Sequence, residues 1–182
     1  MGGVKSCAGA GSSAAPFPHG AILIFGFLKS PPLSPRLHRL KSSALFDTLT
    51  PLELKIVDNL MHERCFLGEE IIFDEGEEGH ALYLVISGHV SINRVRPDHV
   101  EVVAELGPGA FFGDLALLDN SPRNAQARAI DNCELAVFFR ADFVQLMETD
   151  AVIGYKISLA LARHIGLRLR RWMSGDPQIE AL

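Results

Sequence analysis

A residue that could bind a small anion, Arg123, lies in the stretch FFGDLALLDNSPRNAQARA, residues 111–129. Arg123 follows a Ser-Pro turn, and an acid, Asp114, stands nine residues before it. An apolar run precedes the turn and an alanine-rich run follows it. A solvated surface loop does not require such flanks. The pattern therefore favours a pocket that holds one small anion against the guanidinium of Arg123.

The residues around Asp114 predict a second contribution to this pocket. Gly113 permits a tight backbone, and Asp114 opens a short helical insertion that we expect over residues 114–118. The start of a helix presents unpaired backbone N–H groups, which attract an anion. The backbone N–H groups of Asn124 and Ala125 could join the guanidinium around one phosphate, in charge-assisted bonds of about 1.5–3 kcal/mol each.

Both charged residues also have a simpler interpretation. Arginines are usually exposed, so Arg123 taken alone would be a surface residue of a turn. An acid in the first turn of a helix is stabilising by about 0.3–1 kcal/mol without any ligand, and Asp114 fits that role as well. The motif as a whole favours ligand binding for Arg123 and leaves both interpretations open for Asp114.

Other kinds of reactive site find no support in the sequence. The seven histidines include no H-x-H pair, the spacing with which cupin enzymes, built on a related β-roll, bind a metal. The sequence also has no nucleophile elbow and no P-loop. We therefore expect no catalytic residue, no metal and no cofactor, and predict that the protein is not an enzyme. A cupin-type enzyme is the remaining enzymatic alternative.

Composition and charge limit which other functions the protein could have. The net charge of −5 argues against general nucleic-acid binding, which requires a positive surface. Residues 1–43 hold five basic residues and no acid, and are rich in Gly, Ser, Ala and Pro, so we predict a disordered, basic extension. An over-extended start and an organelle-targeting segment are the alternatives, while the apolar run at residues 21–28 is too short to span a bilayer. The three cysteines form no C-x-x-C pair, which fits reduced thiols in the cytoplasm better than a disulfide framework or a zinc site.

Residues 44–150 predict one folded domain that opens with a helix. Thr50 and Glu53 have the spacing of a capping box, and a proline stands at the first helical position. A helix is therefore expected over residues 51–63. Its apolar stripe is expected to comprise Leu52, Ile56, Val57, Leu60 and Met61.

Short apolar runs separated by glycines follow this helix, as is typical of an all-β roll or sandwich. Ser87–Gly88 is predicted to be the turn of a hairpin, and residues 125–128 to continue as a strand. Residues 151–182 are predicted to be a long helix with a short tail. The helix has an apolar stripe (Ile153, Ile157, Leu161, Ile165 and Leu169) and a positive surface (Lys156, Arg163, Arg168, Arg170 and Arg171). The fold class is thus α+β, mainly β.

The stretch FFGDLALLDNSPRNAQA resembles the phosphate-binding cassette of the cyclic nucleotide-binding domain family. That family includes the catabolite activator protein, regulatory subunits of cyclic AMP-dependent kinase and cyclic nucleotide-gated channels. A second motif, GEEIIFDEGEEGHALYLVISGHVSI at residues 68–92, is similar to the family's first strands. The resemblance implies a double-stranded β-helix, a jelly-roll-like β-roll, flanked by an N-terminal helix and a long C-terminal helix.

The resemblance also implies a role for each site residue. Arg123 would pair with the cyclic phosphate, supported by the amides of Asn124 and Ala125, and Asp114 would accept a hydrogen bond from the ribose 2′-hydroxyl. Other residues would contribute backbone groups or line the base: Phe112, Gly113, Leu115, Ala116 and the strand 101–104. The helix 151–173 would act as a lid or as a dimer helix.

Two positions depart from the family's usual pattern. The family usually has glutamate where this chain has Asp114, and the shorter side chain would reach the hydroxyl through water or a backbone shift. Asn124 occupies a position where a threonine often favours cyclic GMP (cGMP). The sequence therefore leaves cyclic AMP (cAMP) and cGMP open as ligands.

These features together predict a cytoplasmic cyclic nucleotide sensor, a regulatory module whose C-terminal helix moves on binding and signals to a partner. The alternative is a ligand-free or repurposed β-roll that acts as an interaction or dimerisation module, for which Asp114 is the main support. We expect an unidentified effector protein and a homodimer through the helix 151–173, and no transmembrane segment. Direct DNA binding is not expected, because too few residues follow this helix to form a DNA-binding domain. The chain could equally be part of a larger protein.

Overall fold

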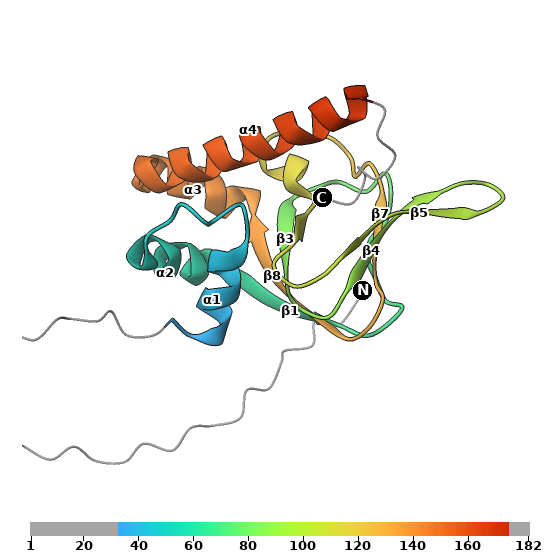
Figure 1. The fold of residues 1–182 in the computed structure, drawn as a ribbon, viewed down its shortest axis with the longest axis horizontal. Helices are drawn as coiled ribbons and strands as arrows, with labels where there is room; N and C mark the ends of the chain where they lie inside the picture. The colour runs from blue at the N-terminus through green and yellow to red at the C-terminus, as the bar shows by residue number, and fades with distance from the viewer. Residues whose placement is uncertain (1–32, 175–182) are drawn as a thin grey trace, which may run out of the picture.

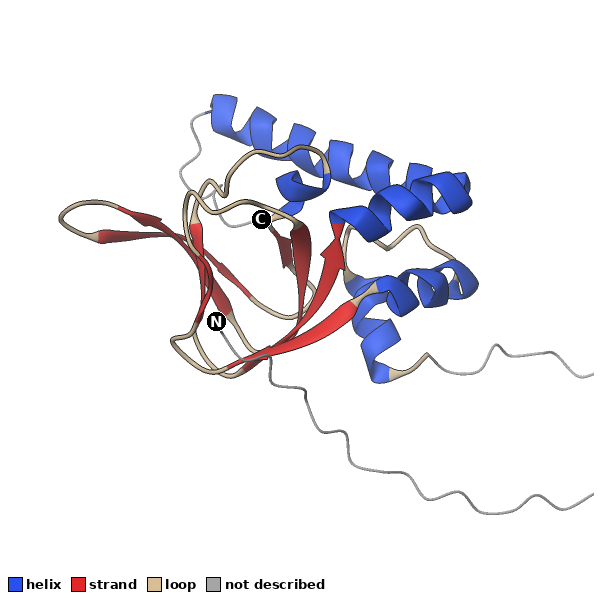
Figure 2. Ribbon diagram, turned by 180° about the vertical axis from the view of Figure 1, so that it is seen from behind, coloured by secondary structure: helices blue, strands red, loops and turns tan. Residues whose placement is uncertain are grey.

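The computed structural model describes residues 33–174, and in this range the chain forms a β-roll with helices packed on one side (Figures 1 and 2). The strands in this range are β1 (His62–Phe66), β2 (Ile71–Phe73), β3 (Ala81–Ser87), β4 (Val90–Val95), β5 (Val100–Leu106), β6 (Phe111–Phe112), β7 (Gln126–Ala129) and β8 (Cys133–Phe139). The helices are α1 (Pro35–Ser42), α2 (Pro51–Leu60), the short 3-10 helix η1 (Asp114–Leu117), α3 (Arg140–Thr149) and α4 (Ala151–Ser174). The predicted fold class is confirmed.

The described strands form two antiparallel four-stranded sheets, in the orders β1-β8-β3-β6 and β2-β7-β4-β5. The register pairs His62 with Val137 in the first sheet and Val90 with Ala129 in the second. Among these strands, β4 and β5 are the one consecutive pair that stays within a sheet. All the remaining connections between consecutive strands therefore cross from one sheet to the other. The two sheets enclose a space between them.

The prediction of a hairpin at Ser87–Gly88 is wrong. Strand β3 pairs with β6 and β8, whereas β4 pairs with β5 and β7, so the two strands do not pair with each other. Gly88 has a φ of +80°, and a Cβ added there would lie 2.6 Å from the carbonyl oxygen of Asn132. The glycine thus permits a tight corner between the two sheets. The predicted strand at residues 125–128 is found one residue later, as β7.

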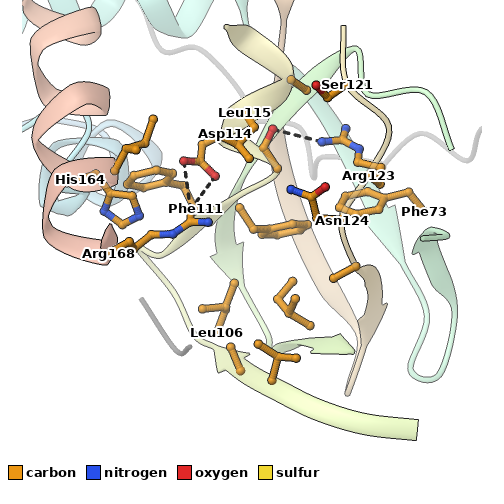
Figure 3. A pocket seen from close by; sticks show the side chains of 18 of the residues that line it. Phe73, Leu106, Phe111, Asp114, Leu115, Ser121, Arg123, Asn124, His164 and Arg168 are labelled. Carbon is orange, nitrogen blue, oxygen red and sulfur yellow. Dashed lines mark hydrogen bonds and ion pairs between the residues drawn. The ribbon is translucent and has the colours of Figure 1, made fainter. Parts of the chain in front are cut away.

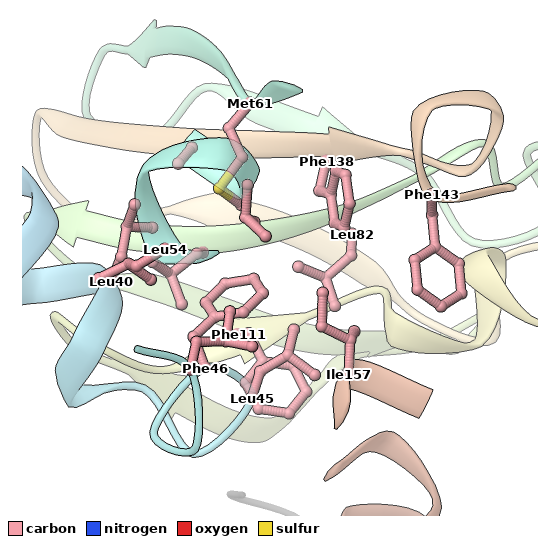
Figure 4. Packing of buried hydrophobic residues seen from close by; sticks show 14 of the residues in the cluster. Leu40, Leu45, Phe46, Leu54, Met61, Leu82, Phe111, Phe138, Phe143 and Ile157 are labelled. Atoms are coloured by element: carbon pink, nitrogen blue, oxygen red, sulfur yellow. The ribbon is translucent and has the colours of Figure 1, made fainter. Parts of the chain in front are cut away.

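The larger hydrophobic core lies between the helices and the sheet that contains β3 and β8 (Figure 4). Phe46, Phe138 and Phe143 are among its largest fully buried side chains. The rings of Phe138 and Phe143 meet edge to face, with centroids 5.8 Å apart. Burying a large apolar side chain stabilises a fold by about 1.5–3 kcal/mol. This core therefore fixes α3 and the start of α4 against the roll.

Helix α1 corrects the predicted boundary at residue 43. Its first turn is capped by Ser34, whose hydroxyl accepts from the backbone N–H of Leu37. Leu37 and Leu40 are 7% and 0% exposed and belong to the larger core. Residues 35–42 are therefore part of the folded domain. A helix of eight residues is too short to show a sustained apolar period. The rest of the predicted extension, residues 1–32, lies outside the described range.

Helix α2 confirms the predicted capping box but buries a different face. The hydroxyl of Thr50 accepts from the backbone N–H of Glu53, and the carboxylate of Glu53 accepts from that of Thr50. Leu54 and Val57 are fully buried, whereas Leu52 is 72% exposed. The helix carries apolar residues on more than one face, and the core selects the stripe that includes Leu54. The predicted stripe is therefore correct for Val57 and Met61, which are buried, and wrong for Leu52 and Ile56, which are exposed. The helix ends at residue 60 rather than 63.

Helix α4 is buried in its first half only. Ile153, Ile157 and Leu161 are fully buried, as the predicted stripe requires, but Leu169 is 53% exposed. The ammonium of Lys156 donates to both carboxylate oxygens of Glu53 on α2, at 2.7 and 2.8 Å. This bond lowers the pKa of Glu53. The first half of α4 is thus anchored, and its second half extends past the core.

Two properties of the described range bear on the remaining sequence predictions. Cys133 is a free, buried thiol, and burial raises its pKa to about 11. Cys65 is disulfide-bonded, so the prediction of reduced thiols is wrong for this residue. Within residues 33–174, no helix combines the length and the apolar character required to span a bilayer.

Candidate functional site

A cavity of about 440 Å³ lies between residues 111–125, the sheet of β4 and β5, and the second half of α4 (Figure 3). We call residues 111–125 the cassette. The volume is typical of small-molecule sites. All eight predicted ligand-binding residues line the cavity: Phe112, Gly113, Asp114, Leu115, Ala116, Arg123, Asn124 and Ala125. The structure therefore brings the predicted residues together, while their role in binding stays a prediction.

The turn at the start of the cassette forms as expected. The helical insertion predicted over residues 114–118 is η1, one turn of 3-10 helix. Gly113 precedes it in a left-handed conformation, with a φ of +69°. A Cβ added at this position would lie 2.5 Å from Nη1 of Arg123. Glycine therefore serves two purposes here, since it permits the left-handed backbone and leaves room for the guanidinium.

Arg123 is a buried cation whose guanidinium lies inside the domain. Its side chain donates from Nη1 to the carbonyl oxygen of Gly113 at 3.1 Å and from Nη2 to that of Ala81 at 2.8 Å. Cζ lies 4.1 Å from the centroid of the Phe73 ring, a cation–π contact. The residue is only 8% exposed, and Nε has no hydrogen-bond partner.

No carboxylate among residues 33–174 forms an ion pair with this guanidinium. Burial is the largest influence on the pKa of Arg123 and lowers it. A buried charge without an opposite charge is costly in free energy. The arrangement is therefore suited to an anion that would enter the cavity.

Asp114 directly follows Gly113 in the cassette and is already paired. The residue is 4% exposed, and both of its carboxylate oxygens accept from Nη1 of Arg168 on α4, at 3.0 and 3.1 Å. Arg168 was predicted to be part of the positive surface of the helix; its side chain is 41% exposed, and it also pairs with Asp114. The ion pair connects the second half of α4 directly to the cassette (Figure 3).

His164 lies one helical turn before Arg168 and also lines the cavity. Its ring contacts that of Phe111, with centroids 4.5 Å apart. Burial lowers the pKa of His164, as do the positive charges of Arg168 and Arg171, while Asp114 opposes the shift. The neutral imidazole is therefore the form that the folded protein favours.

The lowered pKa of His164 predicts how stability depends on pH. The unfolded chain takes up a proton near the ordinary value of 6.5, whereas the folded protein does so only at lower pH. We therefore expect the free energy of unfolding to fall as the pH is lowered from about 7.5 to 5.5, and to fall less in a His164→Gln variant. Urea unfolding at the two pH values measures this difference. Equal losses in both proteins would contradict the expectation.

The end of the cavity away from Arg123 is mainly apolar. Ile92, Val103, Ala104 and Leu106 line it from β4 and β5. Of the strand 101–104, which was predicted to line a base, Val103 and Ala104 line the cavity. Glu101 and Val102 do not line the cavity. A register shift in the pairing of β4 with β5 lies at Ile92/Asn93, and alternation along a regular strand does not predict such an irregularity.

The sequence interpretation made α4 a lid or dimer helix but did not name His164 or Arg168 as site residues. His164, Arg168 and Trp172 all line the cavity and are spaced by four residues, so they share one face of the helix. That spacing was visible in the sequence, but the apolar stripe at the start of the helix gave no reason to look for a second face. Among residues 33–174, no group of three or more histidines, cysteines or acids could hold a metal ion.

Comparison with known proteins agrees with this geometry. Residues 63–150 match the cyclic nucleotide-binding domain family. The chain is 35% identical over 127 residues to the cyclic AMP receptor protein of Thermus thermophilus, covering 69% of this chain and 59% of that protein. The chain thus spans less than two thirds of this relative.

Solved structures show the same fold. The N-terminal domain of a transcriptional regulator from Streptomyces coelicolor superposes with a TM-score of 0.66 at 26% identity, covering 70% of this chain and 91% of that one. The regulatory domain of Toxoplasma gondii PKA, crystallised with cAMP, gives a TM-score of 0.57 at 32% identity, covering 61% of this chain and 42% of that one. The family match covers all eight strands but the first residue of β1, and it includes the whole cassette. Residues 63–150 thus form a domain of the cyclic nucleotide-binding domain family.

Proposed function

We propose that the cavity binds a cyclic nucleotide, with cAMP as the preferred ligand, and that the protein acts as a regulatory module. The observation that carries this proposal is the buried guanidinium of Arg123, which lines the cavity and has no carboxylate partner in the described range. A cyclic phosphate carries one negative charge and would offset the desolvated cation. The amides of Asn124 and Ala125 would add to this anion site.

The rest of the ligand fits the remaining walls of the cavity. The ribose 2′-hydroxyl would donate to Asp114, and the base would lie against the apolar residues of β4 and β5. Gly113, Leu115 and Ala116 would contribute backbone groups, and Phe112 would pack beneath the nucleotide. The proposal favours cAMP because related proteins carry cAMP in their names, and one neighbour was crystallised with it.

The pairing of Asp114 with Arg168 suggests how binding would be transmitted. A ligand that approaches Asp114 would change the surroundings of Arg168. It would thereby change which position of the second half of α4 is preferred. Leu169, Trp172 and Met173 are at least half exposed on this part of the helix. These side chains could meet an effector protein or a second copy of the chain.

One observation favours the alternative, an interaction module with no nucleotide. Arg168 already occupies both carboxylate oxygens of Asp114. An ionised carboxylate offers about four lone-pair sites, however, so it can accept from an arginine and a hydroxyl together. We therefore retain nucleotide binding as the main proposal.

Calorimetry with Trp172 fluorescence tests the proposal directly. Trp172 is the one tryptophan of the chain, lines the cavity and is 75% exposed, so its emission should shift to shorter wavelength if a ligand covers it. We expect cAMP to bind with one ligand per chain, and 5′-AMP, which lacks the ring, to bind more weakly. A protein that gives neither heat nor an emission shift with millimolar cAMP or cGMP would instead support the interaction module.

A further inference from the structure

Arg140, the first residue of α3, connects two loops that lie on either side of it. Its Nη2 donates to the carbonyl oxygen of Gly79 at 3.0 Å and contacts Nδ1 of His80 at 3.2 Å. Its Nη1 donates to the carbonyl oxygen of Asp119 and to Oδ1 of Asn120, both within the cassette. One guanidinium thus joins the loop at residues 79–80 to the middle of the cassette.

The loop that Arg140 holds also supports the backbone of Arg123. The backbone N–H of Arg123 donates to the carbonyl oxygen of Glu77, and its carbonyl oxygen accepts from the backbone N–H of Gly76, both at 2.8 Å. Pro122 forms an isolated bridge with Glu78. Residues 76–80 therefore hold the cassette at two points, directly at Arg123 and through Arg140 at Asp119 and Asn120.

The cassette between these two points has little other support. Asp119, Asn120 and Ser121 are exposed, and the carboxylate of Asp119 accepts from the hydroxyl and the backbone N–H of Ser121. These bonds are local and do not attach the turn to the rest of the domain. The bonds from the guanidinium of Arg140 to Asp119 and Asn120 do attach the turn to the domain, and they also fix it relative to α3.

We propose that Arg140 is a positioning residue for the phosphate site: it aligns the cassette against residues 76–80 so that Arg123 and the amides that follow it face one point. This inference rests on the proposed nucleotide binding. Arg140 does not line the cavity and therefore acts through the cassette rather than on the ligand. It binds Asp119 and Asn120, which precede Arg123 by only four and three residues.

Replacing Arg140 with lysine distinguishes the effect of its positive charge from the effect of its hydrogen-bond geometry. The guanidinium is planar and presents five N–H donors in a fixed arrangement, whereas an ammonium is a compact point charge. Arg140→Lys keeps the positive charge but cannot serve both loops with the same geometry. Asn120→Ala removes one of the acceptors that the guanidinium of Arg140 binds. Because Asn120 lies in an exposed turn, this variant should still fold.

Calorimetric titration of cAMP into the full chain tests the proposal, with Arg36→Ala as the matched control. Arg36 pairs with Asp58 at 2.6 Å and with Glu63 at 3.3 Å, and it does not line the cavity. We expect Arg140→Ala to weaken binding about tenfold and Arg140→Lys and Asn120→Ala about threefold to fivefold. Arg36→Ala should lower the thermal midpoint and leave the Kd unchanged.

A double-mutant cycle distinguishes positioning from general destabilisation. If Arg140 acts through Asn120, Arg140→Ala should cost less affinity in an Asn120→Ala background than alone. Equal costs in both backgrounds, or unchanged binding by Arg140→Lys and Asn120→Ala, would overturn the inference even though the wild type binds. Absence of binding by the wild type would instead reject the proposed function, and the inference with it.

Discussion

Replacing Arg123 with alanine should weaken cAMP binding by about 100-fold or more, because each charge-assisted bond to a phosphate contributes about 1.5–3 kcal/mol and the guanidinium would make at least two. Folding should suffer less than binding does. The variant loses the bonds to Gly113 and Ala81, but it also removes a desolvated cation that has no carboxylate partner in the described range. Calorimetry and urea unfolding of the same samples measure both effects.

Arg128 offers the matched control for this experiment. It lies five residues further along the same segment, does not line the cavity and pairs with Glu69 at 3.7 Å near the surface. Arg128→Ala should bind cAMP like the wild type. A Kd for Arg123→Ala within threefold of the wild-type value would mean that the guanidinium does not anchor the ligand.

Replacing Asp114 with alanine should remove the protein's ability to distinguish cAMP from 2′-deoxy-cAMP. In the wild type, loss of the 2′-hydroxyl should weaken binding at least about tenfold, since hydrogen bonds to a charged group contribute about 1.5–3 kcal/mol. In Asp114→Ala, the two ligands should bind alike, and cAMP itself should bind about as weakly as 2′-deoxy-cAMP binds the wild type. Parallel titrations of both ligands into both proteins give the coupling energy directly.

Arg168 provides a second variant for the same question. Arg168→Ala leaves the carboxylate of Asp114 in place, so discrimination between the two ligands should persist even if both affinities change. Glu148, an exposed acid of α3, is a control whose replacement should alter neither ligand. If Asp114→Ala still preferred cAMP over 2′-deoxy-cAMP by tenfold, the ribose would be recognised elsewhere.

The part of the site that is contiguous in sequence could be predicted, and the part that depends on tertiary packing could not. The eight predicted cassette residues lie within 112–125, where local turn and helix-start signals specify the backbone, and all of them line the cavity. The bond between Asp114 and Arg168 joins residues 54 positions apart. Nothing local to α4 indicates that Arg168 points inward, because that depends on where the core places the helix.

The same distinction explains the errors in the fold. The capping box at Thr50 and Glu53 is local and was predicted correctly. The face of α2 that is buried is set by the elements that pack on it, and an apolar residue on the opposite face, Leu52, misled the prediction. Likewise, the corner at Gly88 has the composition of a hairpin turn, but the identity of each strand's neighbours is decided by the whole roll.

The way α4 is attached limits how much of it a bound nucleotide can displace. Residues up to Leu161 are held by buried packing and by the bond from Lys156 to Glu53, whereas from His164 onward the helix borders the cavity. Gly166, which has no neighbouring atom near the position of a Cβ, lies just beyond this boundary, and glycine weakens a helix by about 1 kcal/mol relative to alanine. If a nucleotide binds as proposed and displaces α4, the expected motion is bending or unwinding of its last two to three turns about a stationary base, and not a rotation of the whole helix. A partner that detects this motion would contact the C-terminal end of the helix, where Trp172 and Met173 would move furthest.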